Sequence, residues 1–224
     1  IFRKEISGFF SSLTGYIVIV FFLLVNSMFM WVLPGEWNVF DSGYAGLDTL
    51  FFISPWVFMF LVPAVTMKMI AEEKRLGTIE LIFSRPVTER AIIYGKYFAS
   101  VALVLLALLP GIIYYISVWQ LGETPGNLDK GGTMGAFIGL FFLAAVYASV
   151  GVFASSLTDN QVIAFILAVS ICFIMYLGFD SLAYLPGFKK IDEFVIRLGI
   201  NEHYKSISRG IIDIKDIAFF VAVI

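Results

Sequence analysis

The chain has 224 residues, of which 60% are hydrophobic and 14% charged, and its formal net charge is −2. A soluble domain averages roughly 45–50% apolar and about 25% charged residues, so this composition excludes a water-soluble globule, a disordered chain and a basic nucleic-acid-binding protein. The single cysteine, Cys172, and the single histidine, His203, exclude an internal disulfide and a multi-histidine metal cluster.

The first segment, residues 1–12, has an amphipathic pattern. Its apolar residues share one helical face, and Arg3, Lys4 and Glu5 lie off that face. The pattern predicts an interfacial helix along the membrane surface, with an ordinary charged flank as the alternative.

Long apolar runs predict six membrane-spanning helices, because about 20 predominantly apolar residues are needed to cross a bilayer. Pro63 lies inside the second run and Pro110 inside the third, and each predicts a bend. The last run is short, so we expect a sixth span that continues beyond the printed sequence, and we expect residues before Ile1. The expected spans cover residues 13–33, 51–70, 91–118, 134–157, 161–179 and 217–224 onward.

Residues 71–90, between the second and third spans, carry eight charges and an apolar cluster. They predict a short helix around Thr78–Phe83 that lies across the membrane surface, with Pro86 as its stop and Thr88 as the cap of the third span. Two interpretations stay open: a docking surface for a cytoplasmic partner, or a hydrated connector that sets the topology.

Basic residues in the loops predict which side each loop occupies. Residues 68–96 hold six Lys and Arg, whereas the loop 34–50 holds none. We therefore expect the N-terminus and residues 71–90 in the cytoplasm and the loop 34–50 outside. Residues 180–216 fall outside by parity, although their six bases oppose that assignment.

Two further patterns concern the second half of the chain. Gly131, Gly135 and Gly139 have a spacing that allows close helix approach, and packing within the subunit is favoured over a dimer interface. Residues 180–216 predict amphipathic outer helices, with a capping loop as the alternative. Their apolar face would consist of Phe188, Ile191, Phe194, Val195 and Leu198.

The sequence contains no catalytic motif. The spans hold almost no ionisable groups between their ends, which weakens an ion-driven transporter. No G-x4-G-K-[ST] loop is present, so any ATP must be bound by another chain. We therefore expect no enzymatic activity and no cofactor in this chain, which we expect to form a single domain over residues 1–224.

Residues 72–97 contain the string E-E-K-R-x-G-T-I-E-L-I-F-S-R-P-V-T-x-x-x-I-I-x-G-K-Y. This string resembles the signature segment of ABC-2-type permeases, the membrane subunits of one class of ABC exporters. Residues 2–12 resemble the elbow helix of that family. Residues 201–217 resemble its outer-loop motif, with Arg209, Gly210 and Asp213 as the matching residues.

The resemblance implies an all-α membrane domain whose coupling helix docks on a separate ATPase subunit. It implies that Arg85, Pro86 and Thr88 fix the exit into the third span, and that Arg3, Lys4 and Glu5 belong to the elbow. The implied coupling element consists of Glu72, Glu73, Lys74, Arg75, Gly77, Thr78, Glu80 and Leu81.

Within the family, the chain resembles the gliding-motility permeases of Bacteroidota. This similarity implies a GldA-like ATPase that binds ATP and Mg, and a GldG-like second membrane subunit or a second copy of the chain, in a bacterial inner membrane. The leading hypothesis is mechanical transmission of ATPase movement. The alternatives are a structural anchor or stator, and a permease for lipid, polysaccharide or metal-maturation export.

Overall fold

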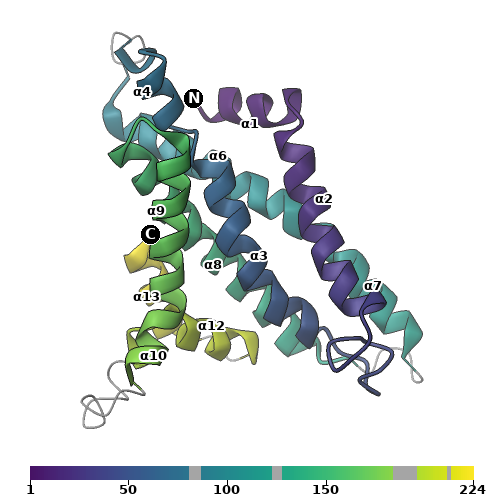
Figure 1. The fold of residues 1–224 in the computed structure, drawn as a ribbon. Helices are drawn as coiled ribbons and strands as arrows, with labels where there is room; N and C mark the ends of the chain where they lie inside the picture. Colours follow the sequence, from purple (N-terminus) through teal and green to yellow (C-terminus); the bar gives the residue numbers. More distant parts are fainter. Residues whose placement is uncertain (81–86, 123–127, 184–195, 211–212) are drawn as a thin grey trace.

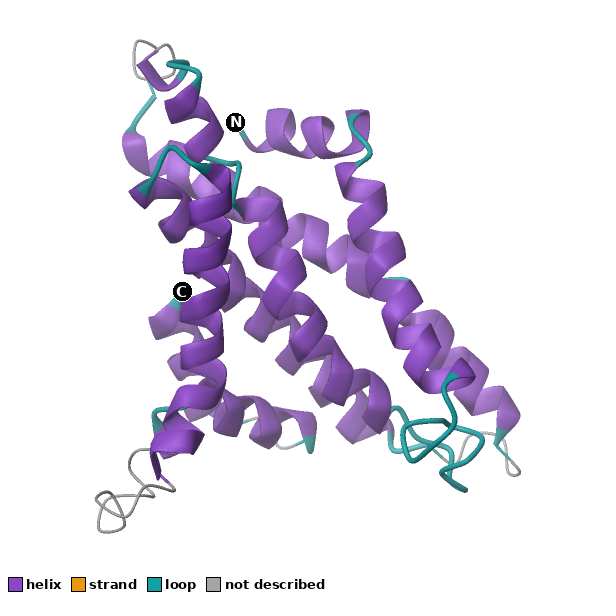
Figure 2. Cartoon of the chain, in the orientation of Figure 1, coloured by secondary structure: helices purple, strands orange, loops and turns teal. Residues whose placement is uncertain are grey.

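The computed structural model describes residues 1–80, 87–122, 128–183, 196–210 and 213–224. Every regular element among these residues is a helix (Figure 2), which confirms the all-α prediction. The α-helices are α1 (Phe2–Ser11), α2 (Thr14–Ser27), α3 (Asp48–Thr66), α4 (Ala71–Arg75), α6 (Glu89–Leu108), α7 (Gly111–Leu121), α8 (Lys130–Leu157), α9 (Gln161–Phe173), α10 (Phe179–Ala183), α12 (Ile200–Ser208) and α13 (Ile214–Val223).

Five helical stretches among the described residues are long and apolar enough to cross a membrane, which confirms the first five predicted spans. Short π-helical turns extend α2 through Met28–Val32 and α9 through Ile174–Gly178. The sixth span stays a prediction, since α13 has ten residues. The five stretches are Thr14–Val32, Asp48–Arg75, Glu89–Leu121, Lys130–Leu157 and Gln161–Leu182.

The third span is broken at Pro110, as predicted, whereas Pro63 lies inside the uninterrupted helix α3. Helix α6 ends at Leu108, and α7 begins at Gly111 with Pro110 as its N-cap. Proline has no backbone N–H to donate, so it interrupts the hydrogen bonds of one helix and is tolerated where the next begins. Gly111 lies against α8, where an added Cβ would sit 3.2 Å from the Phe137 ring.

Helix α8 is the centre of the bundle and packs against α3, α6, α9 and α12. Its buried face is rich in small residues, among them Ala144, Ala148 and Gly151. Small side chains let neighbouring helices approach closely in a membrane, where apolar burial alone does not hold helices together. At Gly151, an added Cβ would collide with the Thr66 side chain of α3.

The helices place two sets of connecting segments at opposite ends of the bundle (Figure 1). One end, which we call the α4 end, holds α1, α4 and the turn at residues 157–160. The other, the α12 end, holds the loop 34–47, α10 and α12. This arrangement agrees with the predicted alternation of loops.

Helix α12 packs on α8 through buried Ile200, Tyr204 and Ile207. An added Cβ at Gly135 would lie 2.5 Å from the backbone oxygen of Ile207, and one at Gly139 would lie 3.3 Å from the Tyr204 ring. The glycine series therefore packs within the subunit, as favoured by the sequence. Of the predicted outer apolar face, Leu198 is exposed, and Phe188, Ile191, Phe194 and Val195 lie outside the described residues.

Candidate functional site: a charged junction at the α4 end

Helix α4 begins against a serine of α8. The Ser155 hydroxyl accepts hydrogen bonds from the backbone N–H groups of Ile70 and Ala71, both at 3.0 Å, and donates to the Met67 carbonyl at 2.9 Å. The first N–H groups of a helix have no partner within it. Because Ser155 is fully buried, its hydroxyl both satisfies these groups and fixes α4 to the central helix.

The end of α4 explains two residues of the predicted coupling element. Gly77 has a φ of +67°, and its N–H bonds the Lys74 carbonyl at 3.1 Å, while the Thr78 N–H bonds the Glu73 carbonyl at 3.0 Å. These two bonds form a Schellman motif, which requires a left-handed residue that glycine adopts without strain. Helical backbone resumes at Ile79.

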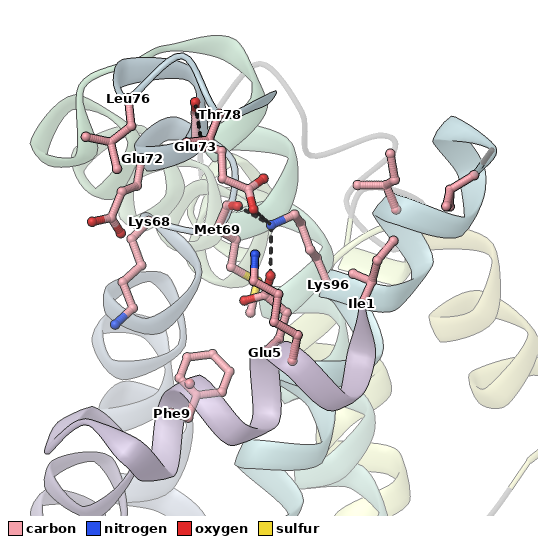
Figure 3. A pocket seen from close by; sticks show the side chains of 14 residues that line it. Ile1, Glu5, Phe9, Lys68, Met69, Glu72, Glu73, Leu76, Thr78 and Lys96 are labelled. Atoms are coloured by element: carbon pink, nitrogen blue, oxygen red, sulfur yellow. Dashed lines mark hydrogen bonds and ion pairs between the residues drawn. The ribbon is translucent and has the colours of Figure 1, made fainter. Parts of the chain in front are cut away.

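Lys96 of α6 joins three segments at this end of the bundle (Figure 3). Its ammonium Nζ lies 3.0 Å from Glu5 Oε1 of α1, 2.9 Å from Glu73 Oε1 of α4, and 2.6 Å from the carbonyl oxygen of Met69. The lysine is 1% exposed. The contacts with Glu5 and Met69 are hydrogen bonds, and the contact with Glu73 is an ion pair. A buried charge is tolerated where it is paired with opposite charge and hydrogen-bonded.

The glycine before Lys96 permits the close approach of α1. An added Cβ at Gly95 would lie 2.8 Å from the Ile1 side chain. Sequence reasoning counted Lys96 as one base of a cytoplasmic loop and did not identify the junction. The available signal was the G-K-Y string at the end of the resembling segment, in which Gly95 and Lys96 are adjacent.

Two further lysines form contacts between helices near the junction. Lys68 donates to the Thr14 hydroxyl of α2 at 3.1 Å and lies 5.7 Å from the centre of the Phe9 ring of α1. Lys74 of α4 donates to the Ser156 carbonyl of α8. Long basic side chains therefore connect α1, α2, α4 and α8 around α6.

A cavity of about 770 Å³ opens between α1, α4 and α6 (Figure 3). Its walls carry both signs of charge, contributed by Lys4, Glu5, Lys68, Glu72, Glu73 and Lys96. Because Lys96 and its two carboxylates form one wall, anything that displaced α4 or α1 would change the shape of this cavity.

The predicted coupling residues divide into an inner and an outer set. Glu73 faces the junction, whereas Arg75, Leu76 and Glu80 are exposed, as is Lys74, with Leu76 at 61%. Glu72 and Thr78 line the cavity. Leu81, Arg85 and Pro86 lie outside the described residues.

Thr88 caps α6, as predicted, by accepting a hydrogen bond from the Ala91 N–H at 3.3 Å. Of the predicted elbow residues, Arg3 and Lys4 are exposed and Glu5 takes part in the junction. The structure thus brings part of the predicted elbow and part of the predicted coupling element together at Lys96.

The outer-loop residues lie at the α12 end, far from this junction (Figure 1). Arg209 is exposed. Gly210 has a φ of +82°, and an added Cβ there would lie 3.0 Å from the Gly132 backbone nitrogen, so the position requires glycine on both grounds. Asp213 caps α13 by accepting from the Lys215 N–H at 3.1 Å.

Metal ligands do not gather in the described parts of the chain: no group of three or more His, Cys, Asp and Glu side chains is arranged to hold an ion. The described site is built from ion pairs and hydrogen bonds between helices. Such an arrangement can hold helices in register and can release them.

Comparison with known proteins places the chain in a family. A search of curated proteins finds no match. The family model described as ABC-2 family transporter protein matches residues 48–209, a stretch that runs from the start of α3 to the Arg209 that follows α12 and so includes α4, Lys96 and the central helix. The chain belongs to the ABC-2 transporter family, whose members are membrane permeases of ABC transporters.

Proposed function

We propose that the chain transmits the movement of a separate ATPase subunit into the membrane through the charged junction. The observation that carries the proposal is the set of three contacts of buried Lys96: hydrogen bonds to Glu5 and to the Met69 carbonyl, and an ion pair with Glu73. If α4 shifts, it must either break its contact with Lys96 or move α6 and α1 with it.

Three connections would carry a displacement of α4 into the bundle. The turn at residues 67–70 joins α4 to α3, Ser155 joins it to α8, and Lys96 joins it to α6 and α1. A five-residue helix has little apolar surface to bury, so α4 depends on these polar bonds for its position. A force applied to it would therefore reach three membrane-crossing helices.

The docking surface in this proposal is the exposed side of α4 and of the segment that follows it, with Arg75, Leu76 and Glu80 as its described residues. An exposed leucine between charges is typical of a small interface, where an apolar contact is surrounded by a polar rim. ATP and Mg would be bound by the partner ATPase, and this end would face the cytoplasm.

The test begins with the ATPase that co-purifies with the chain from its native membrane in mild detergent. Arg75→Glu and Glu80→Lys are expected to weaken its retention and to remove its stimulation by the permease. Arg90→Glu is the matched control, since Arg90 is an exposed base at the same end but lies on α6. Docking at α4 would be rejected if all three variants retained and stimulated the ATPase equally.

The variant Lys96→Met distinguishes the transmission of movement from the docking of the ATPase. This variant leaves the exposed side of α4 intact, so we expect it to retain the ATPase and to lose the stimulation. The triple variant Glu5→Gln, Glu73→Gln, Lys96→Met, which removes the charges that Lys96→Met leaves unpaired, keeps the comparison valid if the single variant folds poorly. Full stimulation in the triple variant would overturn the role of the junction.

We further propose that the system served is gliding motility, with the chain as a GldF-like subunit in a bacterial inner membrane. The support is the resemblance to the gliding-motility permeases described in the sequence analysis, whereas the family match itself extends to ABC-2 transporters in general. Mass spectrometry of the natively purified complex is expected to find a GldA-like ATPase and a GldG-like membrane subunit. A complex with export proteins of another kind would contradict the motility assignment, and a chain that never retains an ATPase would favour the anchor or stator.

A further inference from the structure

A second cavity, of about 440 Å³, lies beside the break at Pro110, where α6 and α7 face α8. Its wall is almost wholly apolar and includes Leu105 and Leu109 of α6 and its end, Ile112 of α7, and Phe137 and Phe141 of α8. The volume is within the range of about 300–1,000 Å³ that small-molecule sites occupy in proteins. We call it the α7 groove.

The α7 groove has polar groups on one part of its wall. They are the side chains of Lys130 and Thr133, in the first turn of α8, and of Tyr115 on α7. From Lys130 to Phe141 the wall follows α8 for eleven residue-to-residue steps, or about 16 Å at 1.5 Å per step. This depth is close to one leaflet, since the hydrocarbon core of a bilayer is about 30 Å thick.

Lys130 gives the groove a positive charge at its polar part. The lysine is exposed, and within the described residues its ammonium has no ion-pair partner. The neighbouring Asp129 carboxylate caps α8, accepting from the Gly132 N–H at 3.0 Å. A cation above an apolar, leaflet-deep groove complements a molecule with an anionic head and a long apolar chain.

We propose that the α7 groove holds one anionic phospholipid from the leaflet at the α12 end. One acyl chain lies along the apolar wall between Leu105 and Phe141, and the phosphate is bound by the Lys130 ammonium with the Tyr115 hydroxyl as a hydrogen-bond donor. The Thr133 hydroxyl already donates to the Asp129 carbonyl at 2.7 Å. The inference does not depend on the ATPase or on the charged junction, which lies at the other end of the bundle.

Native mass spectrometry of the full chain in nanodisc-derived micelles tests the proposal, with phosphatidylglycerol as the probe and diacylglycerol, which lacks the phosphate, as the comparison. We expect one phosphatidylglycerol to be retained. Lys130→Ala is expected to weaken retention about fivefold, in line with the contribution of one basic residue at an anionic surface, and Lys130→Arg to restore it. Lys205→Ala is the matched control, because Lys205 is an exposed base on α12 at the same end.

The apolar part of the groove is tested by Leu109→Trp, which fills the groove at a half-exposed position. We expect this variant to abolish the retention of phosphatidylglycerol. The control Lys205→Ala is expected to leave that retention unchanged. The proposal would be overturned by equal retention of diacylglycerol, by full retention in Leu109→Trp, or by equal losses in Lys130→Ala and Lys205→Ala. Cross-linking gives a further test, with Met134→Cys at the exposed edge of the groove. We expect this cysteine to cross-link to a photoactivatable phosphatidylglycerol. A cross-link to a second copy of the chain instead would also overturn the proposal.

Discussion

The two ends of the bundle are held together by different interactions. At the α4 end, helices meet through charged side chains, and Lys96 alone bonds two carboxylates and a carbonyl from three segments. At the α12 end, α12 lies against the glycines of α8, and the Tyr204 hydroxyl donates to the Phe51 carbonyl at 2.6 Å. Burial raises the pKa of Tyr204 well above its ordinary value, so this bond is neutral at any physiological pH.

The difference indicates which end can move. Two helices whose backbones are in contact have only one favourable arrangement. A small displacement of one helix makes atoms overlap or leaves a void between the helices. Ion pairs tolerate displacement better, because an ammonium can exchange one oxygen acceptor for another or for water. The α4 end therefore suits a moving connection, and the α12 end suits a fixed one, where His203 Nδ1 also lies 2.7 Å from Asp216 Oδ1 of α13.

The largest expected effect comes from breaking the α4 end. Lys96→Met leaves Glu5 and Glu73 facing each other without their cation, and removing one partner of a buried pair costs about 3–5 kcal/mol. Unfolding titrations in mixed micelles measure the loss. Lys68→Met is the control, since Lys68 bonds a hydroxyl and no carboxylate, and an equal loss in both variants would contradict the special role of Lys96.

The next prediction tests whether α12 packs too closely on α8 to admit an added methyl group. Gly135→Ala places a Cβ 2.5 Å from the Ile207 oxygen, so we expect a loss of about 1–3 kcal/mol from overpacking. Gly131→Ala is the matched control on the same helix, where the added Cβ meets nothing closer than 3.5 Å. Equal stability of the two variants in the same titration would show that α12 can move away.

A neutral contact at the α4 end sharpens the comparison. Ser155→Ala removes the acceptor for the Ile70 and Ala71 N–H groups, and a buried group left without a partner costs about 1–3 kcal/mol. Ser149→Ala removes only a bond to the carbonyl of Val146 on the same helix and is expected to cost less. Hydrogen exchange of α4 should rise in the Ser155 variant alone. Unchanged exchange would mean that Lys96 suffices to hold α4.

The smallest expected effect concerns the cap of α6. Thr88→Ala removes the side-chain acceptor of the Ala91 N–H and is expected to cost about 1 kcal/mol, whereas Thr88→Ser retains it. Local hydrogen exchange over residues 89–92 measures the fraying. If serine and alanine behaved alike, the cap would contribute nothing to the start of this span.

The sequence predicts those features that depend on neighbours along the chain. Apolar runs give the five spans because a helix in lipid satisfies its own backbone, Pro110 gives the break, and Thr88 gives the cap. The spacing of Gly131, Gly135 and Gly139 indicates close packing, although it does not identify α12 as the partner.

The junction could not be predicted because its members are distant in sequence. Lys96 and Glu5 are 91 residues apart, and only the packing of α1 across α6 brings them together. A lysine next to an apolar span is ordinarily a topology signal. Ser155 likewise resembles any small residue of a membrane helix until α4 is placed beside it.

The break at Pro110 also bears on how the protein fits a bilayer. The stretch Glu89–Leu121 has 33 residues and would be about 50 Å long if straight, which exceeds a membrane of about 40–45 Å including its headgroups. The bend turns the last eleven residues away from the axis of α6 (Figure 1). The extra residues therefore extend sideways within one leaflet. Helix α7, with Ile113 and Ile116 exposed, increases the area that the protein occupies in that leaflet and does not require the leaflet to thicken.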